Sequence, residues 1–201
     1  MDSKRISIFI IFSALTIVLN LSPFKVPAPY APFLIYEIWE IPIVTVALIY
    51  GFSDGAIVSV INTIMLLIVF PGALPTGPLY NLVAVLSMLI GLVAPLRFSK
   101  KVKFAGESIL LALSTLAGVA VRVIVMTLVN GAFVPYPPPV GFGIPFGVLV
   151  TILPLIAFFN ATITLYTIPL GYALAKAVRK RVLIGGEEAP VLTNREERRL
   201  K

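Results

Sequence analysis

The sequence predicts an all-α integral membrane protein with six transmembrane helices and both termini in the cytoplasm. Three observations support this fold class: the composition, six long apolar segments, and the placement of the basic residues. Of 201 residues, 59% are hydrophobic and 12% are charged, whereas about 25% of the residues of a soluble domain are charged. A water-soluble chain of this length could not bury so much apolar surface, so the surplus is expected to face lipid.

Six apolar segments have the length that a membrane crossing requires. A spanning α-helix needs about 20 mostly apolar residues, and Pro or Gly residues, which break helices, separate most of the segments. The predicted spans are Ile6–Ser22, Leu34–Tyr50, Asp54–Phe70, Leu79–Leu96, Gly106–Asn130 and Pro154–Ala175.

The first segment follows Lys4 and Arg5 and therefore also has features of a signal peptide. No small-x-small cleavage pattern comes after it, because the chain continues Ser22-Pro23-Phe24-Lys25. We interpret the segment as a retained first helix.

The region between the fifth and sixth spans allows two interpretations. A proline-rich stretch, Pro135–Pro139, is followed by a Gly-rich apolar stretch that ends at Leu153. This second stretch is either a re-entrant loop or an extension of the sixth helix bent at Pro154. Pro169 is expected to kink that helix further along.

The basic residues predict the orientation, because Lys and Arg are enriched in cytoplasmic loops. With six spans, three groups of basic residues lie on the same side of the membrane: those before the first helix, those between the fourth and fifth helices, and those after the sixth. Only Lys25 lies in the opposite loops, and Arg122 lies within the fifth predicted helix. The cytoplasmic groups are Lys4 and Arg5; Arg97, Lys100, Lys101 and Lys103; Lys176, Arg179, Lys180 and Arg181; and Arg195, Arg198, Arg199 and Lys201.

The chain divides into a membrane domain and a tail. Residues 1–181 are expected to form the six-helix domain. Residues 182–201 are polar and charged, and we expect a disordered cytoplasmic tail there.

Several function classes are excluded by what the sequence lacks. The absence of Cys and His removes thiol nucleophiles, imidazole bases, Cys/His zinc sites and haem ligation. There is no Gly-x-x-x-x-Gly-Lys-Ser/Thr loop, so the chain is not itself expected to be an ATPase. The net charge of +7 is explained by membrane topology rather than by nucleic-acid binding. We therefore expect no enzyme activity, no cofactor and no metal.

Polar side chains inside a bilayer are costly and usually face an interior or a cavity. In the predicted topology they gather in the outer half, which is the layout of a pocket with apolar walls and a few orienting polar groups. Arg122 is expected to pair with one of two glutamates and so to hold helices together. Each of these residues also has a purely structural alternative. The Asn residues could cap helices, Trp39 could belong to the interfacial aromatic belt, and the glutamates could be solvated. The candidate ligand-binding residues are Tyr36, Glu37, Glu40, Asn81, Asn130 and Asn160.

Six segments of the sequence, in their order and spacing, resemble the S components of energy-coupling-factor (ECF) vitamin transporters, especially the riboflavin-specific ones. The similarity covers nearly the whole chain up to about Arg181. The segments are Ala14–Asn20, Pro27–Leu34, Tyr36-Glu37-Ile38-Trp39-Glu40-Ile41-Pro42, Gly77-Pro78-Leu79-Tyr80-Asn81, Arg122–Asn130 and Pro154-Leu155-Ile156-Ala157-Phe158-Phe159-Asn160.

The resemblance implies a multi-pass subunit of the cell membrane that captures a vitamin, most closely riboflavin, and catalyses no chemistry. It places Asn130 and Asn160 on the polar edge of the ligand ring and Tyr36 and Glu37 near the entrance. Transport would require a coupling transmembrane subunit and two cytoplasmic ATPases, with lipid around the helices and no nucleic acid.

Two positions depart from the family pattern. Riboflavin-specific members have a Lys three residues after the sixth-helix Asn, where this chain has Ile163. The Ala-x-x-x-Ala strip of the first helix, which packs on the coupling subunit, is also absent, because Ala14 is followed four residues later by Val18. Another vitamin or a nucleobase-like precursor on the same scaffold thus remains an alternative. A stand-alone facilitator and a membrane-embedded lipid enzyme are further alternatives, less well supported by these residues.

Overall fold

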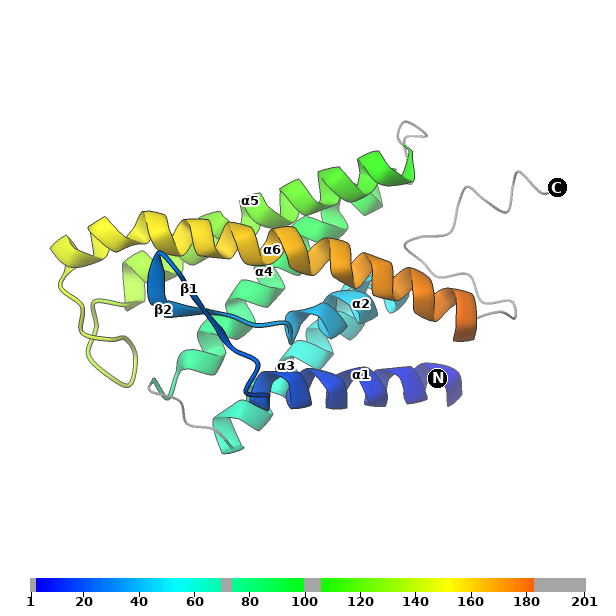
Figure 1. The fold of residues 1–201 in the computed structure, drawn as a ribbon, viewed down its shortest axis with the longest axis horizontal. Coiled ribbons are helices and arrows are strands. Elements are labelled where there is room, and N and C mark those ends of the chain that lie inside the picture. The colour runs from blue at the N-terminus through cyan, green and yellow to red at the C-terminus, as the bar shows by residue number, and fades with distance from the viewer. Residues whose placement is uncertain (1–2, 70–73, 100–105, 183–201) are drawn as a thin grey trace.

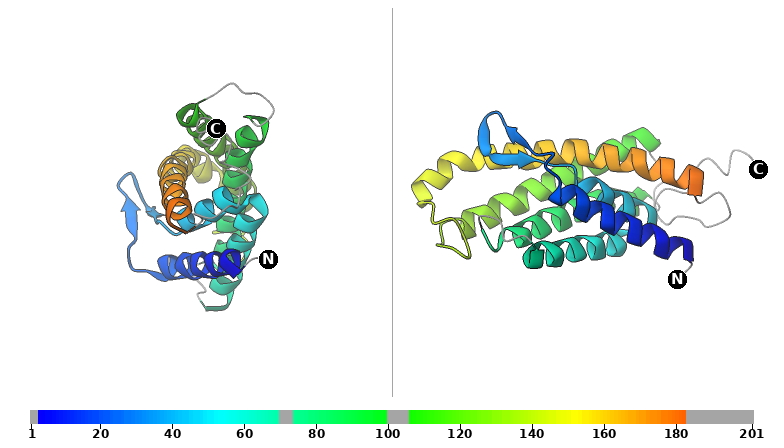
Figure 2. Two further views of the ribbon diagram at one scale, coloured as in Figure 1. Left: turned by 90° about the vertical axis from the view of Figure 1, so that its right-hand side faces the viewer. Right: turned by 60° about the horizontal axis from the view of Figure 1, so that its bottom comes forward.

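The computed structural model describes residues 3–69, 74–99 and 106–182, and shows a bundle of six helices with one β-hairpin (Figure 1). Both described ends of the chain lie at the same end of the bundle, and the hairpin lies against α6 away from that end (Figures 1 and 2). The elements are α1 (Ser3–Leu21), β1 (Val26–Ala28), β2 (Ala31–Tyr36), α2 (Glu40–Tyr50), α3 (Phe52–Val69), α4 (Gly77–Ser99), α5 (Glu107–Phe133) and α6 (Phe146–Val182).

The fold is mostly helical, as predicted, but the hairpin was not predicted. β1 pairs antiparallel with β2, with Val26 opposite Tyr36 and Pro27 opposite Ile35, and the register shifts between Pro27 and Ala28. Proline lacks the N–H that a helix needs, yet is tolerated on an edge strand or at a bulge. The predicted second helix, Leu34–Tyr50, is therefore wrong at its start, because its first residues belong to β2 and α2 begins only at Glu40.

α2 is short and lies in the centre of the bundle. Its 11 residues extend about 16 Å at 1.5 Å per residue, roughly half of the 30 Å hydrocarbon core of a bilayer. Every residue from Pro42 to Ile49 is buried, and α2 packs against α1, α3 and α6. An apolar helix that is buried on all sides behaves as core, so its residues show little helical amphipathicity.

Close helix contacts rely on glycine. A Cβ atom on Gly171 of α6 would lie 2.5 Å from the Val44 side chain of α2, and one on Gly91 of α4 would lie 2.4 Å from the Ala117 carbonyl oxygen of α5. Neither distance is compatible with a side chain. Small residues allow membrane helices to approach closely, which here brings α6 against α2 and α4 against α5.

α6 settles the interpretation of the region before the last predicted span. It runs without interruption from Phe146 to Val182, through both Pro154 and Pro169. From Phe146 onward, the apolar stretch up to Leu153 is consequently a helical extension and not a re-entrant loop. The first predicted span forms α1.

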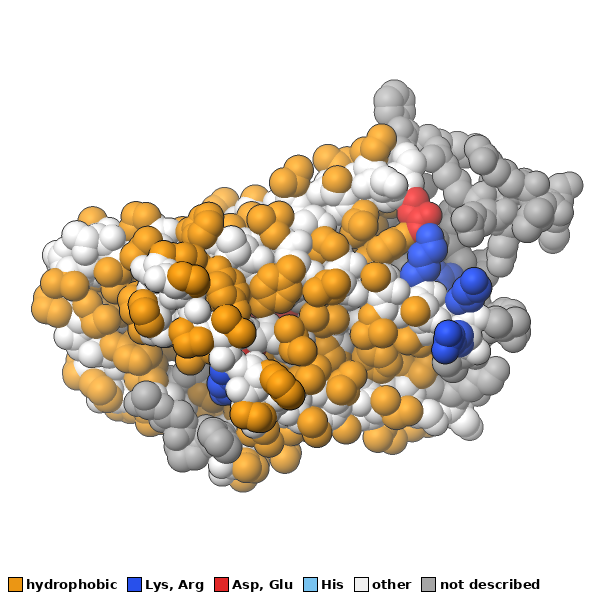
Figure 3. All heavy atoms as spheres, viewed as in Figure 1, with side chains coloured by type: hydrophobic (Ala, Val, Ile, Leu, Met, Phe, Trp, Pro, Cys, Tyr) orange, Lys and Arg blue, Asp and Glu red, His pale blue; other side chains and the backbone are white. Residues whose placement is uncertain are grey.

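Among the described residues, four helices are long and apolar enough to cross a membrane: Phe52–Val69, Gly77–Phe98, Glu107–Phe133 and Phe146–Arg181. Arg5–Leu21 and Glu40–Tyr50 are apolar but shorter. Lys and Arg side chains gather at the end of the bundle where both described ends of the chain lie (Figure 3), including Arg179, Lys180 and Arg181 in the last turn of α6. The predicted tail, except for Val182 at the end of α6, lies outside the described residues.

Candidate ligand-binding cavity

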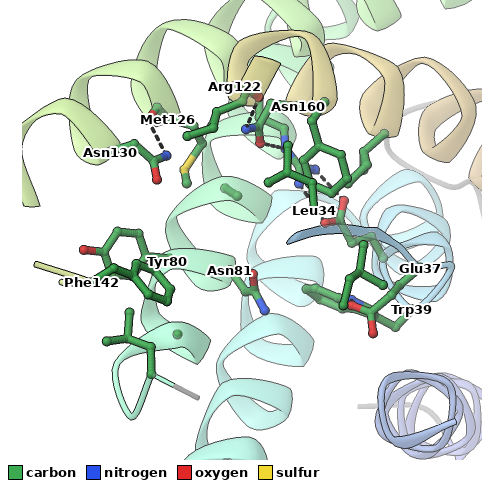
Figure 4. Close-up of a pocket in the computed structure, with 18 residues that line it drawn as sticks. Leu34, Glu37, Trp39, Tyr80, Asn81, Arg122, Met126, Asn130, Phe142 and Asn160 are labelled. Atoms are coloured by element: carbon green, nitrogen blue, oxygen red, sulfur yellow. Dashed lines mark hydrogen bonds and ion pairs between the residues drawn. The ribbon is translucent and has the colours of Figure 1, made fainter. Parts of the chain in front are cut away.

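A cavity of about 250 Å³ lies on the hairpin side of the bundle (Figure 4). The hairpin, the segment before α2, and helices α4, α5 and α6 all contribute to its walls, which are mainly apolar and aromatic. The lining residues are Leu34, Ile35, Glu37, Trp39, Glu40, Leu74, Gly77, Tyr80, Asn81, Ala84, Arg122, Met126, Asn130, Phe142, Ile156, Phe159, Asn160 and Ile163.

The late start of α2 explains where the cavity is. Because α2 begins at Glu40, the space that one or two further turns would occupy is left between the surrounding helices. The preceding chain forms the hairpin instead, and Leu34 and Ile35 of β2 form part of the cavity wall. The cavity therefore lies at the amino end of a helix that is too short to fill the bundle.

An ion pair joins three elements at the cavity wall. Arg122 Nη2 donates to Glu40 Oε1 at 2.9 Å, and Arg122 Nη1 donates to Glu40 Oε2. Arg122 Nε donates to Asn160 Oδ1 at 3.0 Å. The exposed fractions are 3% for Arg122 and 4% for Glu40. An unpaired charge at such a depth would be very costly, so the bidentate pairing is what allows both residues to be buried.

Glu37 is held by a different set of partners at the rim. Its Oε1 lies 3.0 Å from Lys25 Nζ, and its Oε2 accepts a hydrogen bond from Trp39 Nε1 at 3.1 Å. Trp39 is only 4% exposed, so it is not a residue of the interfacial aromatic belt. Sequence reasoning missed the role of Lys25, although its isolation among the outer loops was a usable signal.

Two asparagines supply the remaining hydrogen-bonding groups of the wall. Asn130 Nδ2 donates to the Met126 carbonyl oxygen, which leaves its Oδ1 as an acceptor on the cavity side. Asn81 forms no hydrogen bond within the part of the chain that the structure describes. Figure 4 shows both side chains facing the same space.

Tyr36 does not line the cavity. Its hydroxyl lies 2.5 Å from that of Tyr30 and 2.6 Å from Thr162 Oγ1, which fastens the hairpin to α6. Tyr166 of α6 adds a hydrogen bond to the carbonyl oxygen of Glu37. Burial and the hydrogen bond with Tyr36 raise the pKa of the Tyr30 phenol above its ordinary value.

The structure thus brings five of the six candidate residues, together with Arg122, to one cavity. Glu37, Glu40, Asn81, Asn130 and Asn160 line it, while Tyr36 holds the hairpin that forms one wall. Within the described residues there is no group of three or more acidic, His or Cys side chains that could hold a metal ion. The arrangement can bind and orient a small molecule.

No protein-family model and no curated protein sequence matches the chain. Among solved structures, the chain is similar to the S component of a bacterial ECF transporter, with a TM-score of 0.69 and 22% sequence identity. The match covers 90% of this chain and 98% of that one. The chain is therefore a mostly helical, multi-pass membrane protein with the fold of an ECF transporter S component.

Proposed function

We propose that the chain is the substrate-binding S component of an ECF-type importer in the cell membrane. In this proposal the six helices lie in the bilayer with the short α2 enclosed by the others, both termini face the cytoplasm, and the cavity opens to the outside. A coupling transmembrane subunit and two cytoplasmic ATPases would supply the energy for uptake. The chain itself performs no chemistry and only captures its ligand.

The observation that carries the proposal is the position of the cavity relative to the basic residues. The cavity lies on the hairpin side, whereas the Lys and Arg residues at the end of α6 lie at the other end of the molecule (Figures 3 and 4). Basic residues favour the cytoplasmic face, so the cavity belongs to the outer half. A pocket at one end of the molecule suits capture of a ligand rather than passage through a channel.

The favoured ligand is riboflavin. Apolar and aromatic walls such as Trp39, Tyr80 and Phe159 suit a planar ring, and the Asn81 and Asn130 amides suit the hydrogen-bonding edge of that ring. Ile163, which is buried in the wall, favours a second candidate: another vitamin or a nucleobase-like precursor on the same scaffold.

The test is the visible absorption spectrum of the detergent-purified protein after riboflavin has been added and the excess removed. We expect a retained flavin band that is weakened in Asn81→Leu and unchanged in Thr151→Val, an exposed position of α6 outside the wall. Asn160 is a poorer choice, because its replacement would also remove a partner of Arg122.

Two negative results have different meanings. Well-folded protein without a flavin band would overturn the riboflavin assignment and direct a thermal-shift screen to other vitamins. Uptake that persists without any ATPase would overturn the S-component proposal itself.

A further inference from the structure

All charged side chains of the cavity wall have counter-charges within the protein. Glu40 is neutralised by Arg122 through two hydrogen bonds. Glu37 is neutralised by Lys25, which lies 3.0 Å away. The three charged residues of the wall and Lys25 therefore sum to zero, and no formal charge is left over for a ligand.

Each charged group of the wall also has polar partners within the protein. Both carboxylate oxygens of Glu37 and both of Glu40 are accepting hydrogen bonds or facing a cation. Arg122 uses Nε for Asn160 and both terminal nitrogens for Glu40, and its Nη1 also lies 3.6 Å from the Met88 sulfur. Each carboxylate keeps further lone pairs and Arg122 Nη2 keeps a second N–H, but these atoms belong to ion pairs that are already neutralised, so a charged ligand would gain no counter-charge from them.

The polar groups of the wall that lie outside these ion pairs are neutral. Asn81 retains its amide donors and acceptor, and Asn130 retains its Oδ1 acceptor. A neutral ligand exchanges hydrogen bonds to water for hydrogen bonds to these amides. A carboxylate or ammonium would lose its hydration without gaining a counter-charge, which is expensive in a low-dielectric site.

From this balance we infer that the cavity selects ligands without net charge, and that Glu40 is the residue that sets this selectivity by neutralising Arg122. The inference rests on the proposed binding function and specifies the class of substrate: a neutral ring compound, with its acid and ammonium derivatives excluded. Glu40 acts on the ligand through Arg122 and is a positioning residue.

Matched neutral and anionic compounds provide the test. Binding of four pairs to the full chain in detergent would be measured by thermal shift and titration. The pairs are 10-carbamoylmethylflavin and 10-carboxymethylflavin, nicotinamide and nicotinate, biotinamide and biotin, and pantothenol and pantothenate. For any pair that binds, we expect the neutral member to bind more tightly by about tenfold or more, which corresponds to 1.4 kcal/mol.

Removing one negative charge from the wall sharpens the test. In Glu40→Gln the guanidinium loses its counter-charge, so we expect the preference to shift toward the acid by about tenfold or more. The double variant Glu40→Gln with Arg122→Gln removes both charges and should restore the neutral preference. Glu107→Gln, at an exposed ion pair with Lys176, is the matched control and should leave the preference unchanged.

The outcomes separate the inference from the proposed function. Equal or tighter binding of the acid to the wild-type protein overturns the inference, whether or not the variants fold, and leaves the binding function intact. If Glu40→Gln does not fold, Glu37→Gln, which frees Lys25 at the rim, should produce a smaller shift toward the acid; no shift would overturn the charge-balance argument. Absence of binding by every compound, riboflavin included, would overturn the binding function and the inference with it.

Discussion

Both terminal nitrogens of Arg122 donate hydrogen bonds to the carboxylate of Glu40, which joins the middle of α5 to the first residue of α2. This pair links a helix that is long enough to cross a membrane to one that is not. It also forms part of the cavity wall. One contact therefore supports both the packing of the short helix and the shape of the candidate site.

Replacing Glu40 with Ala should destabilise the protein strongly, because Arg122 would remain buried without a counter-charge. Breaking a buried ion pair from one side costs about 3–5 kcal/mol. The measurement is the thermal unfolding midpoint in detergent. Glu107→Ala is the control, since its partner Lys176 is 60% exposed in its side chain and exposed pairs contribute about 0–1 kcal/mol. Equal effects of the two changes would contradict this account.

Gly91→Ala should also lower stability, for a steric reason. The added Cβ would lie 2.4 Å from the Ala117 carbonyl oxygen, so α4 and α5 would have to separate. Overpacking of this kind typically costs about 1–3 kcal/mol. Gly147→Ala, where no atom lies within 4 Å of the added Cβ, serves as the control in the same thermal assay and should be neutral or slightly stabilising.

Tyr36→Phe should loosen the hairpin while the helices stay folded. The change removes the hydroxyl that lies between Tyr30 and Thr162, at a cost of about 1–2 kcal/mol for hydrogen bonds of this type. Hydrogen exchange should become faster in the hairpin and remain unchanged in α4 and α5. Tyr136→Phe, at an exposed position, is the comparison; a uniform increase of exchange over the whole chain would argue against local loosening.

Alkaline pH should weaken the same fastening. The pKa of Tyr30 in the hairpin turn is raised by burial and by its hydrogen bond with Tyr36, so the folded state favours the neutral phenol. This contribution is fully present below the unfolded pKa of about 10 and is lost as the pH rises through the higher folded value. Between pH 9 and about pH 11, the wild-type unfolding midpoint should therefore fall further than that of Tyr30→Phe. Equal falls of the unfolding midpoint in the wild-type protein and in Tyr30→Phe would show that a group other than Tyr30 titrates.

Much of the fold could be predicted because its determinants are local. The lengths of the apolar segments predict where helices form, since a bilayer leaves no partner for an unpaired backbone group. The prolines between Pro23 and Pro32 correctly indicated a break, but the pairing of Val26 with Tyr36 depends on two strands meeting. A hairpin of this kind leaves only a weak pattern when its turn contains no glycine.

The sequence by itself determined the apolar helices, the concentration of basic residues, and the presence of one buried cation that needed an acidic partner. Only the tertiary structure decided which acid this is, because Glu40 and Arg122 lie 82 residues apart and Glu37 was an equal candidate by position. It also decided that α2 begins at Glu40, which leaves the cavity at the amino end of this helix. Pairing and empty volume arise from the packing of distant segments, and local propensity carries no information about either.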